Sequence, residues 1–334
     1  MKKKTVMSII LYVFAVMALL LLVYIFISKN MFRKENIEIV LVVKTIDPSF
    51  EFWKMVRAGA LFACNEEGIR LTIEGPQQEE DIDTQIGIME KLLHTRPSAI
   101  ILAATDYDKL VPVSKKATSE KIPLITVDSG INSDAPASFI ATDNVHAGEK
   151  AGRKIIDLLK PGSHVVLMNF IKGTSTAIER EKGVKKALLD SKIIIDGVLY
   201  CNNIREKATE LTLDVFKKNR HLKGIIALND PSTVGVARAI KKLGQKGKIK
   251  IIGFDNSIEE IEYLEEGLID ALVVQKPFNM GYLSVKTAIK SIRSESVAKN
   301  IDTGSNVVTL ENMYAEENQK LLFPVIKEVP YTRF

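Results

Sequence analysis

From residue 37 onward the sequence alternates short apolar runs with segments of helical periodicity. The runs are rich in β-branched residues without a clean apolar-polar alternation, which is typical of parallel strands covered by helices on both faces. They lie at residues 37–44, 70–74, 99–104, 123–127, 139–141, 164–170, 193–200, 224–228, 248–254 and 270–274. No low-complexity linker separates the first five runs from the second five. The pattern predicts an α/β fold of two similar lobes, each with a parallel sheet and crossover helices.

Residues 1–36 have a different character. Thr5 to Ser28 is a run of 24 residues without a charge, and a helix of that length, at about 1.5 Å per residue, outspans a hydrocarbon core of about 30 Å. No small-residue cleavage site and no cysteine follows the run, so neither a cleaved signal peptide nor a lipoprotein anchor fits. Basic residues flank it on both sides, so the charge rule barely decides its orientation. We predict a single-pass anchor and linker over residues 1–36, inserted in the cell membrane, with the remaining chain extracellular.

Composition argues against several functions. The net charge is +5, and the lysines at positions 2, 3, 4 and 29 supply most of it, so nucleic acid is not indicated. Cys64, Cys201 and the four scattered histidines show no metal-ligand spacing. Residues 173–177 (Gly-Thr-Ser-Thr-Ala) lack the second glycine of a nucleophile elbow, and no Walker loop is present. We therefore predict no enzymatic activity, no metal and no cofactor.

Several strands are followed by a single polar residue. In open α/β sheets ligands bind beyond the carboxyl ends of the strands, which makes these residues candidates for a site. Together with nearby helical residues, the candidates are Trp53, Asp128, Arg180, Asn229, Asp255 and Gln275. Two carboxylates, a guanidinium, two amides and an aromatic face suit a neutral polyol, whose hydroxyls both donate and accept hydrogen bonds. A phosphate or carboxylate ligand would instead need several cations.

Most candidates also have a purely structural interpretation. Trp53 follows Phe50 by three residues, as two core residues on one helix face would. Asp128 and Asp255 could begin turns or cap the next helix. Arg180 lies in a charged run and would by default occupy a solvated helix face.

The remaining alternatives concern the second half of the chain. Gln275 could belong to a hinge only. Asp230 precedes Pro231, and we interpret it as a helix N-cap, which leaves Asn229 free to contact a ligand.

Seven motifs occur along the chain in a fixed order: Phe52-Trp53 with Ala58-Gly59-Ala60, Ile122 to Asp128, Ile140 to Asn144, Gly173-Thr174-Ser175 with Glu179-Arg180, Leu228-Asn229-Asp230, Ile252 to Asp255, and Gln275. Together they resemble the type I periplasmic sugar-binding proteins, the ribose- and galactose-binding family whose fold also forms the effector domain of the lactose-repressor class. The resemblance covers about residues 37–313.

The resemblance implies a set of ligand contacts and no chemical reaction. Phe52 and Trp53 would stack on a sugar. Its hydroxyls would bond to Asp128, Arg180, Asn229, Asp255 and Gln275. The family commonly has an arginine after the first aspartate, and Ser129 stands there in this chain, which removes a donor and leaves room. The expected ligand is therefore a pentose or hexose, with ribose doubtful.

The resemblance also implies two Rossmann-like lobes joined by a three-stranded hinge, which closes on the ligand. The expected crossings between lobes lie near residues 140–143, 254–256 and 275–277. The expected lobes comprise residues 37–141 plus 276–305, and 142–275 plus 306–325.

Three functions fit such a chain. A membrane-anchored sugar receptor would pass its closed state to a sensor histidine kinase, whereas a solute-binding subunit would deliver sugar to an ABC permease. A repressor would need a DNA-binding headpiece where the apolar run stands, which nearly excludes it. Because an uncleaved anchor favours a fixed membrane partner, the sequence favours the sensor, with the importer as the alternative.

Overall fold

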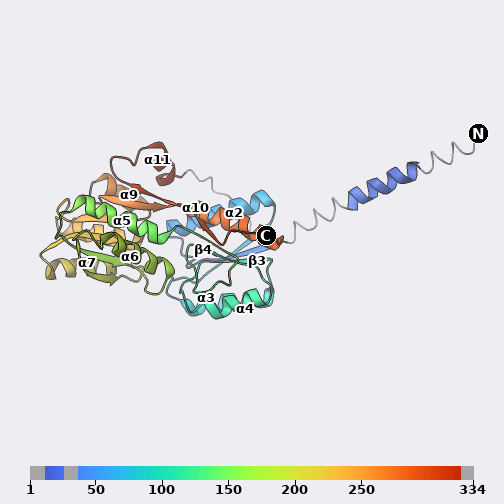
Figure 1. Ribbon diagram of the computed structural model, residues 1–334, viewed down its shortest axis with the longest axis horizontal. Coiled ribbons are helices and arrows are strands. Elements are labelled where there is room, and N and C mark those ends of the chain that lie inside the picture. The colour runs from blue at the N-terminus through green and yellow to red at the C-terminus, as the bar shows by residue number, and fades with distance from the viewer. Residues whose placement is uncertain (1–11, 26–36, 325–334) are drawn as a thin grey trace, which may run out of the picture.

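The computed structural model describes residues 12–25 and 37–324 of the chain, and two α/β lobes follow the N-terminal helix (Figure 1). Residues 12–25 are helical and exposed along their whole length. Within the described residues, no helix combines the length and the apolarity that a membrane crossing requires. The predicted anchor, residues 1–36, lies largely outside the described residues.

Within residues 37–324, the first lobe is built on a six-stranded sheet of order β11-β5-β4-β3-β1-β2, and all its neighbouring strands are parallel. Its strands are β1 (Glu38–Val42), β2 (Arg70–Glu74), β3 (Ala99–Leu102), β4 (Leu124–Val127), β5 (Ser138–Ala141) and β11 (Asn300–Asp302). Its helices are α2 (Glu51–Glu67), α3 (Ile82–Thr95), α4 (Val111–Ser119) and α10 (Pro277–Ile292). Helices α2 and α10 cover one face of the sheet and α3 and α4 the other (Figure 1).

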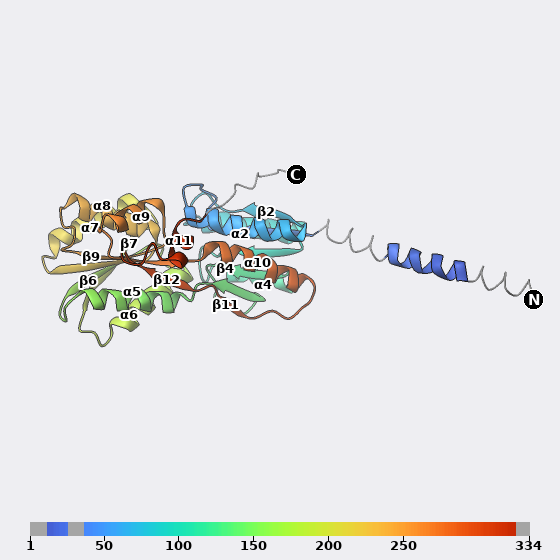
Figure 2. The same cartoon turned by 90° about the horizontal axis from the view of Figure 1, so that it is seen from above.

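The second lobe, also within residues 37–324, repeats this plan with a six-stranded sheet of order β12-β10-β9-β8-β6-β7. Its strands are β6 (His164–Asn169), β7 (Ile194–Tyr200), β8 (Leu222–Ala227), β9 (Lys250–Phe254), β10 (Ala271–Gln275) and β12 (Ser305–Val308). Its helices are α5 (Asn144–Leu158), α6 (Ser175–Leu188), α7 (Arg205–Lys218), α8 (Asp230–Lys242), α9 (Ile258–Glu265) and α11 (Glu316–Leu322). Seen from above, α5 and α6 lie on one side of the sheet and α7, α8 and α9 on the other (Figure 2).

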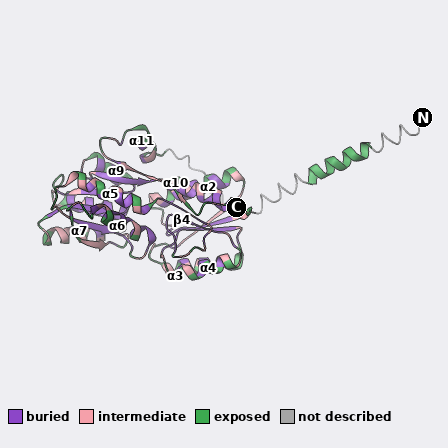
Figure 3. Cartoon of the chain, in the orientation of Figure 1, coloured by how far each residue is buried: buried purple, intermediate pink, exposed green. Residues whose placement is uncertain are grey.

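The strand sequences explain this three-layer plan. Successive side chains of a strand point to opposite faces. In β1, Ile39 and Leu41 pack into the core under α2 and α10, whereas Val40 and Val42 pack into the core over α3 and α4. Both faces are therefore buried, as the burial colours of the central strands show (Figure 3). This explains why the runs are apolar throughout rather than alternating.

The predicted α/β fold of two lobes is confirmed, and each of the ten predicted strands occurs within about two residues of its predicted ends. The short strands β11 and β12 were not predicted. Strand β12 runs antiparallel to β10, so the second sheet is not purely parallel. The two lobe ranges remain a prediction.

One predicted crossing between the lobes is wrong. Residues 254–256 do not leave the second lobe, because β9 and β10 pair in one sheet, with Ile252 opposite Ala271. The chain instead passes between the lobes after β5, after β10, and between β11 and β12 at Thr303 and Gly304.

Close helix pairs hold each lobe together, and α2 against α10 is the pair that supports the first lobe. Gly281 of α10 lies directly on the backbone of α2. A Cβ added at Gly281 would stand 1.9 Å from the carbonyl oxygen of Val56, and one at Gly59 of α2 would stand 2.0 Å from that of Phe278. Only glycine permits this separation, because a backbone atom cannot yield as a flexible side chain can.

We expect Gly281→Ala to lower the free energy of unfolding by about 1–3 kcal/mol, since the two helices must move apart. Gly87→Ala is the matched control. Gly87 is an exposed helical glycine of α3 with nothing within 4 Å of its added Cβ, and this change should stabilise the protein by about 0.5–1 kcal/mol. Denaturant unfolding of both variants measures the difference, and equal effects would contradict the close helix contact.

Candidate ligand-binding site between the lobes

A pocket lies between the lobes at the carboxyl ends of both sheets. The pocket is lined by Lys44, Phe50, Phe52, Trp53, Glu79, Asp128, Phe170, Thr176, Arg180, Asn203, Asn229, Asp230, Pro231, Asp255 and Gln275. All seven residues selected from the sequence are among them. Whether they contact a ligand remains a prediction.

Trp53 forms part of the pocket wall on the first lobe. It lies in the first turn of α2 and is only 2% exposed. Its indole Nε1 donates to Glu79 Oε1 at 2.8 Å. The Phe52 ring meets it edge to face, with ring centroids 5.1 Å apart and planes at 88°. Because Trp53 also belongs to the apolar core under α2, both interpretations offered by the sequence apply to it.

A buried ion pair stands beside Trp53. Lys44, just after β1, places Nζ 3.0 Å from Oδ2 of Asp128, which follows β4. Both side chains are almost completely buried. Asp128 has a φ of 60°, a left-handed conformation that aspartate tolerates better than most residues. Its carboxylate bonds to Lys44 and to the hydroxyl of Ser129, so it does not act as the helix cap that the alternative interpretation suggested.

Arg180 is buried beneath the pocket rather than solvated. This residue of α6 is 2% exposed, so the surface interpretation is wrong. Its Nε donates to Asn144 Oδ1 at 2.8 Å and its Nη1 to the carbonyl oxygen of Leu228 at 2.7 Å. The guanidinium lies over the Phe254 ring at 4.6 Å. Burial lowers the pKa of Arg180, and the nearby Asp255 carboxylate opposes this shift.

Asp255 and Gln275 form a buried hydrogen-bonded pair at the ends of β9 and β10. Asp255 Oδ1 accepts from Gln275 Nε2 at 2.6 Å, and Oδ2 accepts from the backbone N–H of Asp230 at 3.1 Å. Burial raises the pKa of Asp255, and the charge of Arg180 opposes the rise. Among the described residues, Gln275 Oε1 is buried without a hydrogen-bond partner. A ligand hydroxyl that donated to it would remove this desolvation penalty.

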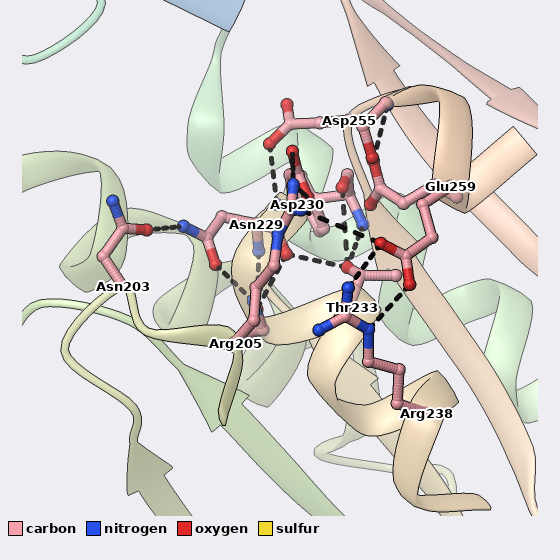
Figure 4. A network of polar contacts seen from close by, with 12 residues as sticks. Asn203, Arg205, Asn229, Asp230, Thr233, Arg238, Asp255 and Glu259 are labelled. Atoms are coloured by element: carbon pink, nitrogen blue, oxygen red, sulfur yellow. Dashed lines mark hydrogen bonds and ion pairs between the residues drawn. The ribbon is translucent and has the colours of Figure 1, made fainter. Parts of the chain in front are cut away.

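Asn229, not Asp230, caps helix α8 (Figure 4). Asn229 Oδ1 accepts from Ser232 N at 3.2 Å, and its Nδ2 donates to Asn203 Oδ1 at 2.5 Å. Asp230 is the first helical residue and pairs with Arg205 at 3.1 Å, while burial raises its pKa to about 6. The prediction that Asp230 is the cap is therefore wrong by one residue. Asn229 lines the pocket, and its side-chain carbonyl oxygen already accepts the hydrogen bond from Ser232 N.

The two lobes touch directly at the pocket's edge. The N–H of Gly130 in the first lobe donates to Ser175 Oγ at the start of α6, at 2.9 Å. The neighbouring hydroxyls of Ser129 and Thr176 lie 3.3 Å apart. Ser129 thus faces the other lobe, where the family pattern has an arginine. These contacts join the two lobes directly at this edge of the pocket.

Sequence reasoning missed five polar residues of the pocket: Lys44, Glu79, Thr176, Asn203 and Asp230. Lys44 and Asn203 each follow a strand by two or three residues, so the rule that selected Asp128 could have found them. Glu79 lies in the polar loop after β2 and offered no signal in the sequence. Its position became evident only through its bond to Trp53.

No metal site accompanies the pocket in the part of the chain that the structure describes: there, no three histidine, cysteine or acidic residues are grouped to hold an ion. Cys64 and Cys201 are buried free thiols. Burial raises the pKa of Cys64 to about 12, which makes it a structural rather than a reactive cysteine.

Residues 39–296 match the periplasmic binding protein domain, and the chain belongs to this family of two-lobe ligand-binding proteins. Among curated relatives, the ribose import binding protein RbsB of Haemophilus influenzae is 28% identical over 271 residues, which cover 81% of this chain and 91% of the relative.

Solved structures agree with this assignment. A solute binding protein of an ABC transporter from Agrobacterium vitis, with bound D-fucose, is 35% identical with a TM-score of 0.82, covering 86% of this chain and 100% of its own. A carbohydrate transporter solute binding protein from Agrobacterium radiobacter, in complex with D-arabinose, is 30% identical with a TM-score of 0.82, covering 86% and 99%.

We expect Lys44→Met to destabilise the protein by about 3–5 kcal/mol, because Asp128 would remain as a buried charge without its partner. Methionine preserves the length of the side chain. The control is Lys91→Met, whose pair with Glu74 is exposed on the lysine side and should change the free energy of unfolding by no more than about 1 kcal/mol. Denaturant unfolding would contradict the role of the ion pair if both variants behaved alike.

Proposed function

We propose that this chain is a monosaccharide-binding protein that delivers its sugar to an ABC importer in the membrane. The observation that carries the proposal is a pocket between two lobes, in which carboxylates, amides, a guanidinium and an aromatic wall are mixed. A neutral polyol satisfies such a mixture, because each hydroxyl donates one hydrogen bond and accepts others. Relatives named for ribose import, and solved relatives with bound D-fucose and D-arabinose, support a pentose or hexose ligand.

In this proposal the sugar bridges the lobes. Its C–H face lies against Phe52 and Trp53 of the first lobe. From the second lobe, Arg180 donates and Asp255 accepts, while Gln275 Oε1 gains the donor it lacks. Asp128 accepts on the first lobe, and Asn229 donates its remaining amide hydrogen. The ligand stabilises the closed arrangement because only there can both lobes bind it at once.

The comparisons with known proteins change our prediction of the membrane partner. The sequence favoured a sensor histidine kinase, whereas relatives named as import and transporter proteins favour a permease. We therefore propose the permease. The uncharged run from Thr5 to Ser28, with no lipoprotein cysteine after it, supports a fixed tether to the membrane, with the lobes on its outer side. Because a fixed tether also suits a sensor, the sensor histidine kinase remains the partner of the second candidate function. Co-purification of the full-length protein with a permease or with a kinase decides between the two.

We expect a panel of monosaccharides to identify one sugar that raises the thermal unfolding midpoint more than its epimers do. Arg180→Ala and Asp255→Ala should each weaken binding of that sugar by about 1–3 kcal/mol or more, because buried polar partners lose their hydrogen bonds. Arg220→Ala and Asp190→Ala, at exposed positions of the same lobe, are the matched controls. Wild-type affinity in either pocket variant would remove that residue from the site.

Closure of the lobes can be tested by changing a residue that does not line the pocket. Ser175 does not line the pocket, but it accepts the cross-lobe bond from Gly130. We expect Ser175→Ala to weaken sugar binding by about fivefold, the effect of about 1 kcal/mol, with an unchanged order of preference among sugars. Ser119→Ala, which removes a hydroxyl bonded within its own helix, should have no effect in the same calorimetric titration. A changed preference would show that Ser175 acts on the ligand rather than on closure.

A further inference from the structure

The charges of the pocket do not balance. Among the described residues, six charged side chains line it: Lys44, Glu79, Asp128, Arg180, Asp230 and Asp255. Asp230 has its own partner in Arg205, at 3.1 Å. Two cations therefore remain for three carboxylates, and one carboxylate is left without a counter-ion.

The unbalanced carboxylate is Glu79. Lys44 is committed to Asp128, with Nζ 3.0 Å from Oδ2. The guanidinium of Arg180 lies in the second lobe, and its strongest attraction is to Asp255. In the described part of the chain Glu79 forms no ion pair within 4 Å, and its Oε1 accepts one neutral hydrogen bond, from the Trp53 indole.

The surroundings of Glu79 favour its neutral form. Burial raises its pKa, with further increases from the carboxylates of Asp128 and Glu80. The charge of Lys44 and the Trp53 N–H oppose the rise. In an open pocket, water would hydrate this carboxylate. When the lobes close on an uncharged ligand that water is displaced, and an unpaired buried charge is relieved most readily by a proton.

We propose that Glu79 makes the pocket selective for uncharged sugars and takes up one proton from bulk water when such a sugar binds. This inference rests on the proposed function and adds the charge class of its ligand. Because Oε1 accepts from Trp53, the proton resides on Oε2, where the neutral carboxyl can donate to a sugar hydroxyl. An anionic sugar would add a second unbalanced charge, so the pocket rejects sugar acids.

The direction of the pH effect follows from linkage. Protonated Glu79 is favoured more in the closed complex than in the open protein, so the affinity for a neutral sugar rises as the pH falls through the raised pKa of the closed form. The gain levels off at the ordinary range of a glutamate, and it is at most about tenfold per pH unit. Asp230 and Asp255 also have raised pKa values, so the test must separate Glu79 from them.

The test is calorimetric titration of the full-length protein, in a detergent without a sugar head group, with the sugar identified by the thermal panel. Wild type should bind about threefold or more tightly at about pH 5.5 than at about pH 7.5. Buffers of different ionisation enthalpy should report proton uptake. Glu79→Gln, which keeps an acceptor for Trp53, should bind at the higher pH at least as tightly as wild type and lose the pH dependence. Glu80→Gln, at the exposed neighbouring position, should retain it.

Three results would overturn the inference: a wild-type affinity that does not change with pH, a Glu79→Gln variant with the wild-type pH dependence, or equal affinity for the uronic acid of the same sugar. The second result would assign the titration to another carboxyl with a raised pKa, such as Asp230, Asp255, Glu260 or Glu179. Failure of every monosaccharide to bind would refute the proposed function instead, so the two failures are distinguishable.

Discussion

The structure depends on the burial of charged side chains where the two lobes meet. A buried charge is costly unless it has a partner, and each lobe compensates its own as far as it can. Lys44 neutralises Asp128 at the end of the first sheet. Arg180 is held from below by Asn144 and a backbone carbonyl, with its plane over Phe254. Gln275 Oε1 remains a buried acceptor without a donor among the described residues, which we assign to a ligand hydroxyl, and Glu79 remains a carboxylate without a cation, which we assign to a proton.

The fold places these groups with little freedom. The carboxyl ends of parallel strands lie at the same edge of a sheet, so the residues that follow the strands lie close together. The hinge then brings the two edges face to face. Gln275 belongs to both features, because it ends β10 at the point where the chain returns to the first lobe and it also lines the pocket. The two sequence interpretations of this residue, hinge and site, are compatible.

Much of the fold could be predicted because parallel strands buried on both faces form conspicuous apolar runs. Strands β11 and β12 were not predicted because Asn300–Asp302 and Ser305–Val308 are short and partly exposed. The third crossing between the lobes lies between these two strands, so it was misplaced as well. Local capping was misjudged by one residue because Pro231 can occupy the first or the second helical position. Glu79 could not be found at all, since a loop carboxylate becomes significant only when folding brings it to Trp53.

The most direct test of our account is a crystal structure of the protein with the sugar selected by the thermal panel. We expect one sugar between the lobes, stacked on Trp53 and within hydrogen-bond distance of Arg180, Asp255 and Gln275, with Glu79 facing a hydroxyl. A sugar bound elsewhere, or held by one lobe alone, would contradict the claim that side chains from both lobes close on one uncharged ligand.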